Sequence, residues 1–240
     1  MNTLMDETLL LLKEASDNHG DKLVYSCSLS PQGMVLIDLI CQYDLGIRIV
    51  TLDTGRLPKA TYDLMASLTD KYGGILDIRF PDSEEVQNMV KSDGINGFYD
   101  SLENRKRCCA IRKIHPLQKV LKGKEAWITG RRKDESKNRA DIQAVEDDPV
   151  YGLKKYNPMR NWTEKDVWAY IRDHELPYNA LHDQFYVSIG CDCCTRAISM
   201  GEDPRSGRWW WENEDTLVEC GLHVSSLKAP KGENESGDGI

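Results

Sequence analysis

The chain has 240 residues, of which 40% are hydrophobic and 29% charged, and its formal net charge is −8 at pH 7. This length can bury a real core in one large domain or two small ones, so folding does not require disulfides. The acidic balance argues against a general nucleic-acid binder. No apolar run approaches the roughly 18 residues that span a bilayer, and the acidic N-terminus is unlike a secretory signal. We expect a cytoplasmic protein, whose eight cysteines need a use other than disulfides.

The first half of the chain alternates predicted strands and helices. Short β-branched or apolar runs typical of strands occur at 22–27, 47–52, 75–80 and 125–129. Helical patterns fill 32–43, 59–72 and 83–92, the last with Ser83 as its expected N-cap and Gly94 beyond its end. This order predicts an α/β fold, with a mostly parallel, twisted, Rossmann-like sheet that carries helices on both faces.

Ligands of such sheets bind at the carboxyl ends of the strands. In this chain those ends fall at 26–28, 53–55 and 129–132. The first of them runs through Ser26, Ser28 and Gly33 into a helix, a turn that can hold a phosphate through N–H groups and the helix dipole. It is not a Walker A loop, and an ordinary turn of small residues is the alternative.

The second half of the chain is less regular. A helix is predicted at 163–173, capped by Thr163 with Asp166 in its first turn. From Gly190 onward, glycine, proline and charged residues dominate. We expect an α/β nucleotide-binding domain at 1–190, a C-terminal segment at 191–227 that folds over it, and a disordered tail at 228–240.

Basic residues concentrate between Arg105 and Arg139. This stretch has thirteen Lys or Arg and three Asp or Glu, a balance of +10, which leaves −18 for the remaining chain. A strongly basic patch on an acidic protein suits a small polyanion. A solvated basic helix face is the alternative.

Five cysteines lie in two groups that can supply one metal centre. Cys108 and Cys109 are adjacent, and Cys191 and Cys194 form a C-x-x-C with Cys193 between them. Four thiolates suit zinc or a [4Fe–4S] cluster, although a contiguous pair is awkward for a tetrahedral zinc site. The C-x-x-C spacing favours Cys193 as a bystander.

Three further cysteines lie elsewhere. Cys27 and Cys41 occur in apolar runs and are expected to be small buried hydrophobes. Cys220 stands in a polar tail and is either incidental or reactive. Reactivity requires neighbouring positive charge, for which the nearby candidates are Arg205, Arg208 and His223.

Together these motifs resemble the iron–sulfur branch of the adenylyl-sulfate (APS) and phosphoadenylyl-sulfate (PAPS) reductase family. The resemblance covers most of the chain. It rests on TLDTGR at 51–56, RCCAIRK at 107–113, AWITGRR at 126–132, SIGC at 188–191, CTR at 194–196, GRWWWE at 207–212 and ECGLH at 219–223. Two positions depart from the family pattern: the turn after Ser28 reads Leu-Ser-Pro-Gln-Gly, and Cys193 occupies a spacer position.

The resemblance implies an adenine nucleotide alpha hydrolase-like fold and the reduction of APS to sulfite and AMP, a step of sulfate assimilation and cysteine biosynthesis. Cys220 would attack the sulfur of APS, and thioredoxin or a similar dithiol protein would then release sulfite. The relatives are homo-oligomers, so we expect a homo-oligomer here.

The resemblance also assigns roles to residues of this chain. It implies a [4Fe–4S] cluster held by Cys108, Cys109, Cys191 and Cys194. Catalysis would involve Cys220, Lys113 and His223. Substrate would be bound by Ser26, Ser28, Leu52, Asp53, Thr54, Gly55, Arg132, Arg205 and Arg208. Guanidinium groups suit this task because their donors pair bidentately with tetrahedral oxyanions.

Two alternatives stay open. The same chemistry on PAPS, alone or beside APS, would need extra cationic contacts for the 3′-phosphate. A non-catalytic nucleotide-binding protein with a structural zinc would leave Cys220 incidental.

Overall fold

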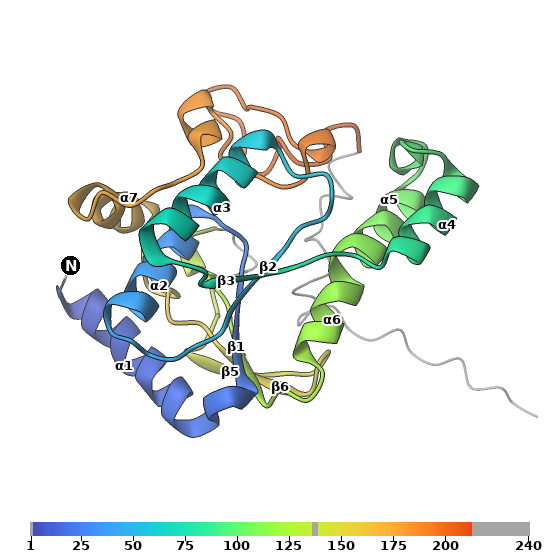
Figure 1. Cartoon of the computed structure of the whole chain (residues 1–240). Helices are drawn as coiled ribbons and strands as arrows, with labels where there is room; N and C mark the ends of the chain where they lie inside the picture. The colour runs from blue at the N-terminus through green and yellow to red at the C-terminus, as the bar shows by residue number, and fades with distance from the viewer. Residues whose placement is uncertain (1, 136–138, 213–240) are drawn as a thin grey trace, which may run out of the picture.

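The structure is a computed structural model that describes residues 2–135 and 139–212 (Figure 1). The predicted catalytic residues Cys220 and His223 and the expected tail at 228–240 lie outside the described residues. The division of the chain at residue 190 stays a prediction. Among the described residues, no helix combines the length and the apolarity needed to cross a membrane.

The centre of the molecule is a six-stranded sheet in the order β3-β2-β1-β4-β6-β5. Its strands are β1 (Leu23–Cys27), β2 (Ile49–Leu52), β3 (Leu76–Arg79), β4 (Ala126–Ile128), β5 (Val145–Asp148) and β6 (Leu153–Tyr156). All neighbours run parallel except β5, which is antiparallel to β6. The predicted mostly parallel sheet is therefore confirmed.

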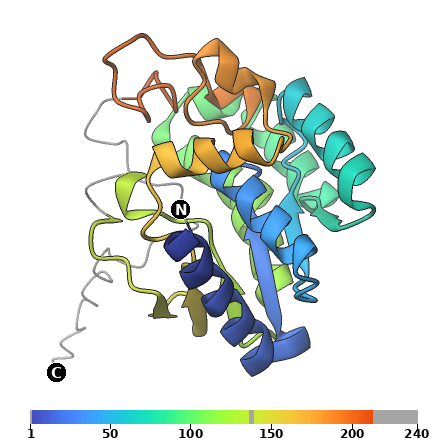
Figure 2. The same ribbon diagram turned by 90° about the vertical axis from the view of Figure 1, so that its left-hand side faces the viewer.

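Helices cover both faces of the sheet, as predicted (Figures 1 and 2). The larger core lies under α1 (Asn2–His19), α2 (Pro31–Gln42), α3 (Lys59–Tyr72) and α7 (Glu164–Asp173). The smaller core lies on the opposite face, under α6 (His115–Leu121). Side chains alternate along β1: Leu23 and Tyr25 point into the first core and Val24 into the second.

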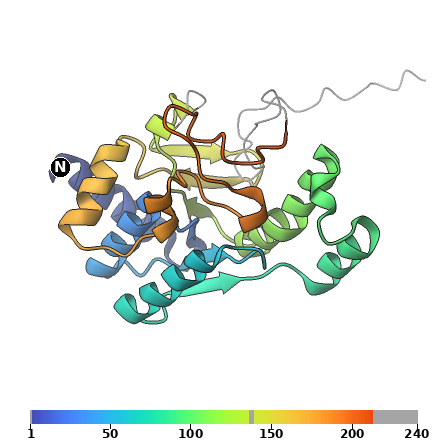
Figure 3. The same cartoon turned by 90° about the horizontal axis from the view of Figure 1, so that it is seen from above.

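Helices α4 (Ser83–Asp93) and α5 (Leu102–Cys109) extend to one side of the sheet (Figures 1 and 3). The start of α4 corrects one prediction, because Asp82 is its N-cap and accepts hydrogen bonds from the N–H groups of Glu84 and Glu85. A carboxylate caps a helix as well as the expected Ser83 hydroxyl would. Its negative charge also interacts favourably with the partial positive charge at the helix N-terminus. At α7 the predicted Thr163 and Asp166 form a complete capping box.

Five of the main helices and strands are not predicted by the sequence patterns: α1, α5, α6 and the two strands of the β5–β6 hairpin. The hairpin strands are four residues each and rich in charge, so they lack the apolar signal of a strand. Lys155 and Asp148 hold the hairpin through an ion pair of 2.7 Å in which both side chains are 1% exposed. A pair of that kind requires a tertiary environment that no local pattern encodes.

Candidate functional site

A cavity of about 550 Å³ opens at the carboxyl ends of β1, β2 and β4. The chain leaves β1 toward β2 on one side and returns to β4 on the other, so β1 and β4 flank the topological switch point of the sheet. Ligands of open parallel sheets bind at such a point. Eight of the predicted residues line the cavity: Ser26, Ser28, Leu52, Thr54, Lys113, Arg132, Arg205 and Arg208.

Two predicted substrate-binding residues, Asp53 and Gly55, do not line this cavity. The Oδ1 atom of Asp53 accepts hydrogen bonds from the Gly55 N–H at 2.7 Å and from the Tyr62 hydroxyl at 2.9 Å. Gly55 has φ of +70°, a conformation that favours glycine. Their contacts therefore brace the turn after β2, which carries Thr54.

The turn between β1 and α2 forms one wall of the cavity. Leu29 adopts φ of +58° and donates its N–H to the buried sulfur of Cys27 at 3.3 Å. Burial raises the pKa of the Cys27 thiol to about 11, which fits its predicted role as a buried small hydrophobe. A Cβ at Gly33 would lie 3.1 Å from that sulfur, so glycine lets α2 begin close to the strand. The helix thereby presents its N-terminus and Ser30 to the cavity.

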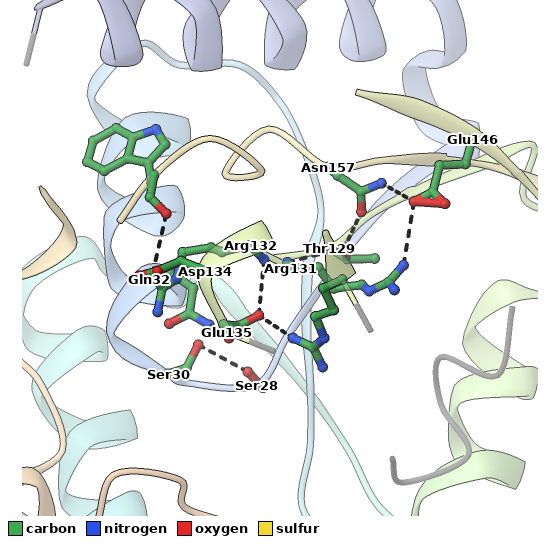
Figure 4. Close-up of polar contacts among 12 residues, drawn as sticks. Ser28, Ser30, Gln32, Thr129, Arg131, Arg132, Asp134, Glu135, Glu146 and Asn157 are labelled. Carbon is green, nitrogen blue, oxygen red and sulfur yellow. Dashed lines mark hydrogen bonds and ion pairs between the residues drawn. The ribbon is translucent and has the colours of Figure 1, made fainter. Parts of the chain in front are cut away.

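A polar network forms the adjoining wall (Figure 4). Glu135 accepts a hydrogen bond from Gln32 Nε2 at 2.8 Å and from the Arg132 backbone N–H at 3.0 Å, and it also pairs with Arg139. Arg132 is 7% exposed, and its Nε–H has no hydrogen-bond partner among the described residues. An unsatisfied buried donor costs roughly 1–3 kcal/mol, so a bound anion would offset part of this cost.

The guanidinium of Arg208, which lines the cavity, packs directly against Gly190. A Cβ at Gly190 would overlap the guanidinium of Arg208, and even its Nη1 atom would lie only 2.9 Å away. The protein contacts of the guanidinium are long: Nε to the Cys194 carbonyl and Nη1 to the Ser188 hydroxyl, both at 3.4 Å. Gly190 therefore leaves the space in which Arg208 lies.

The four predicted metal ligands converge beside the cavity. Cys108 and Cys109 end α5, and Cys191 precedes a short 3₁₀ turn (Asp192–Cys194) that Cys194 ends. We call the small space between them the cysteine pocket; it is lined by Arg56, Phe98, Arg105, Cys108, Cys109, Arg112, Lys113, Cys191, Cys193 and Cys194. None of these five cysteines forms a disulfide. The two cysteine motifs, which are far apart in the sequence, thus line the same small pocket.

A π-helical turn (Ala110–Ile114) directly follows Cys109 and leads into α6. Such turns are rare and occur frequently at functional sites. Arg112 on this turn donates to the Thr54 carbonyl at 2.6 Å, and the Thr54 hydroxyl contacts the Cys191 sulfur at 3.2 Å. One residue at the end of β2 therefore connects both cysteine segments.

The last described segment of the chain is anchored beside the cysteine pocket. Glu212 forms a two-pronged ion pair with Arg105, in which both N–O distances are 2.7 Å and the side chains are 7% and 5% exposed. The Arg105 guanidinium also lies over the Trp209 ring, 4.5 Å from its centroid. The chain thus leaves the described region next to Cys109 and the start of the π-helical turn.

The donor set fits a thiolate-bound metal or cluster. Four thiols from two segments, with three arginines and Lys113 around them, match the soft ligands that iron–sulfur clusters and zinc take. Cys193 also lines the pocket, with its sulfur 3.8 Å from that of Cys194. The agreement is therefore one of donor type and shared pocket: within 2–135 and 139–212, no three Cys, His, Asp or Glu side chains are placed to hold a metal ion in this structure.

Several residues that line the site were given no role from the sequence. Arg56, Arg105 and Arg112 line the cysteine pocket, and Gln32, Arg139, Trp168 and His182 line the cavity. Arg105, Arg112 and Arg139 belong to the basic stretch, which was a usable signal. Burial lowers the pKa of His182, so this ring contributes a neutral hydrogen-bonding group at pH 7. Nothing in the sequence distinguishes it from a core histidine.

Comparisons with known proteins identify the family of this chain. The model of the phosphoadenosine phosphosulfate reductase domain family matches residues 22–197. The chain is 48% identical to the adenosine 5′-phosphosulfate reductase of Allochromatium vinosum, over 85% of this chain and 79% of that protein. It is 42% identical to the enzyme of that name from Burkholderia cepacia, over 95% and 90% of the two chains.

Solved structures support the fold. A phosphoadenylyl-sulfate reductase from Candida auris, in a phosphate complex, has a TM-score of 0.66 at 28% identity and covers 77% of this chain and 88% of its own. An FMN adenylyltransferase from Candida glabrata, with a TM-score of 0.58 at 14% identity over 90% and 77% of the two chains, shares the fold alone. The family match over most of the chain and the identity to full-length relatives lead to one conclusion: this protein belongs to the APS/PAPS reductase family.

Proposed function

We propose that this protein reduces APS to sulfite and AMP, as a step of sulfate assimilation. The observation that carries the proposal is the position of Lys113, which lines both the cavity and the cysteine pocket. A cation at that boundary can balance charge on an anion bound in the cavity. The names of the two bacterial relatives described above favour APS as the substrate.

The proposed reaction has two steps. The Cys220 thiolate attacks the sulfur of APS, an S–O bond breaks, and AMP leaves with the electron pair of that bond. The enzyme then carries an S-sulfocysteine. A thioredoxin thiolate attacks the Cys220 sulfur and sulfite leaves with the S–S electron pair. The second thioredoxin thiol resolves the mixed disulfide, so the dithiol is oxidised while sulfur(VI) becomes sulfur(IV).

The basic residues of the cavity have a distinct part in the first step. Arg205, Arg208 and Lys113 line it together with the turn after β1, and preorganised cations stabilise negative charge that develops on a transferring group. Arg132 extends the basic wall toward the phosphate of the nucleotide. His223 would supply positive charge near Cys220 and keep its thiol ionised.

Cys220 follows Glu212 by eight positions. A stretch of that length spans at most about 28 Å. Because Glu212 is anchored to Arg105 beside the cysteine pocket, this limit is compatible with attack at a sulfur bound near Lys113. The buried ion pair therefore supports the assignment of the nucleophile.

A [4Fe–4S] cluster is the proposed cofactor, held by Cys108, Cys109, Cys191 and Cys194. Its thiolate ligands would tie the two cysteine segments together and place negative charge near Lys113. Anaerobic purification tests this cofactor against structural zinc. Iron with acid-labile sulfide and broad visible absorption would support the cluster, whereas a colourless zinc protein would favour the non-catalytic alternative.

The decisive experiment traps the covalent intermediate. The holoenzyme is mixed with APS in the absence of thioredoxin, digested, and analysed by mass spectrometry for one SO₃ group on Cys220. The variant Cys220→Ser should release no sulfite but still bind AMP and keep its metal content. A modified peptide elsewhere, or sulfite release by the serine variant, would exclude this mechanism. A kcat/KM for PAPS equal to or above that for APS would overturn the substrate assignment.

A further inference from the structure

Cys193 faces the cysteine pocket, although the C-x-x-C spacing makes it a spacer residue. Its side chain lines the pocket and is half-buried. The other spacer residue, Asp192, is exposed and does not line the pocket. The described residues that line the pocket therefore include five thiols, whereas the proposed cofactor takes four thiolate ligands.

Two segments from outside the 3₁₀ turn hold its backbone. The Asp192 N–H donates to the carbonyl of Arg56, which follows β2, at 2.8 Å. The hydroxyl of Tyr99, which ends another 3₁₀ turn (Gly97–Tyr99), donates to the Cys193 carbonyl at 2.7 Å. Both spacer residues are thus held by hydrogen bonds of their backbone. Contacts within the protein therefore direct the Cys193 side chain to the pocket.

The sulfur of Cys193 lies next to that of Cys194, at a distance of 3.8 Å. Rotation about one bond moves a cysteine sulfur between staggered positions. Cys193 can therefore reach a metal ion at Cys194 by a change of its side chain alone. Cys108 and Cys109 show that two consecutive cysteines of this chain can line the pocket together.

One thiolate can replace another at iron or zinc, because both carry the same charge on the same soft donor atom. In such an exchange the metal–sulfur bond to Cys194 breaks and a bond to Cys193 forms. The Cys193 thiol loses its proton as it binds, and the released Cys194 thiolate takes one up. No electron is transferred, so the exchange requires no oxidant or reductant.

We propose that Cys193 is a reserve ligand of the cysteine pocket, which takes the ligand position of Cys194 when that sulfur is released or absent. The inference rests on the thiolate-bound metal of the proposed function, but not on the identity of the substrate. Its consequence is that the metal stays bound when one ligand is lost, so its release from the protein is slowed.

The metal content of anaerobically purified full-length variants tests the proposal. Cys194→Ala should keep the larger part of the iron and acid-labile sulfide, because Cys193 replaces the missing thiolate. The double variant Cys193→Ala/Cys194→Ala should lose most of both. Alanine is used because the oxygen of a serine could itself bind iron. Equal metal loss in the single and the double variant would overturn the proposal.

Cys108→Ala is the matched control, because its neighbour Cys109 already belongs to the proposed ligand set. This variant should lose metal as the double variant does. Equal metal retention in Cys194→Ala, Cys108→Ala and the double variant would show that three thiols suffice, and would exclude a reserve ligand. Thermal melting and AMP binding establish that each variant folds.

A second measurement leaves the four proposed ligands intact. Cys193→Ala should purify with the metal content of the wild type, but should release its metal to a chelator several-fold faster. Equal release rates would contradict a reserve ligand. Zinc in place of iron would exclude the proposed cofactor, yet the same variants can be compared by their zinc content. Failure of the proposed function and failure of this inference are therefore separate outcomes.

Discussion

The cavity and the cysteine pocket lie side by side but are built differently. The cavity is formed mainly by the ends of three parallel strands and the start of α2, and backbone hydrogen bonds of the sheet set their positions. The cysteine pocket is formed by α5, a π-helical turn and a segment with little regular structure. Side-chain contacts of Arg105, Arg112 and Thr54 hold it together.

This difference indicates how each region should respond to change. A site placed by a sheet tolerates loss of one side chain without changing shape. A site placed by a few buried charged contacts should loosen when one of them is removed. Three substitutions test this distinction.

Lys113 belongs to both regions, so its loss should have the largest effect on activity. Lys113→Ala should lower kcat by roughly 10²- to 10³-fold, the range for loss of one preorganised electrostatic contact, while AMP binding and iron content are kept. Steady-state kinetics, calorimetry and metal analysis measure the three quantities. The control is Lys119→Ala on the same helical stretch, which removes only a long surface contact with Asp82. Loss of iron in Lys113→Ala would instead make the residue structural.

Glu212 tests the stability of the cysteine pocket. Glu212→Gln leaves Arg105 buried without its charged partner and should cost about 3 kcal/mol, at the lower end of the range for breaking a buried pair. Denaturant unfolding measures this loss, and hydrogen exchange should increase in α5 and the π-helical turn but not in β1 or α2. The matched control is Glu202→Gln, whose ion pair with Arg196 leaves the two side chains 34% and 37% exposed, so its loss should cost less. Equal stability of both variants would contradict the distinction.

Gly190 should have the smallest effect, confined to the binding of the substrate. Gly190→Ala displaces the Arg208 guanidinium and should raise KM about tenfold, or roughly 1.4 kcal/mol, with less change in kcat. A double-mutant cycle with Arg208→Ala tests whether Gly190→Ala acts through Arg208. In the Arg208→Ala background, Gly190→Ala should raise KM no further. Gly74→Ala, whose new Cβ would meet no atom within 4 Å, is the control. Additive losses would show that Gly190 acts independently of Arg208.

Much of the site was predictable because it follows strand ends. Ser26, Ser28 and Thr54 were placed by the rule that ligands bind where parallel strands end, and they line the cavity. Asp53 occupies the same stretch of chain, but its hydrogen bonds to Gly55 and Tyr62 were invisible, because Tyr62 lies on the next helix. Which member of a motif faces the ligand depends on the direction of its side chain.

The sequence alone predicted the alternation of strands and helices and the mostly parallel sheet, because local periodicity and residue type encode both. Tertiary structure decided how Arg105 meets Glu212, how Arg208 crosses Gly190, and how Lys113 comes to border two spaces. These contacts join residues up to 107 positions apart. Their energies depend on burial from water, which a local pattern does not specify.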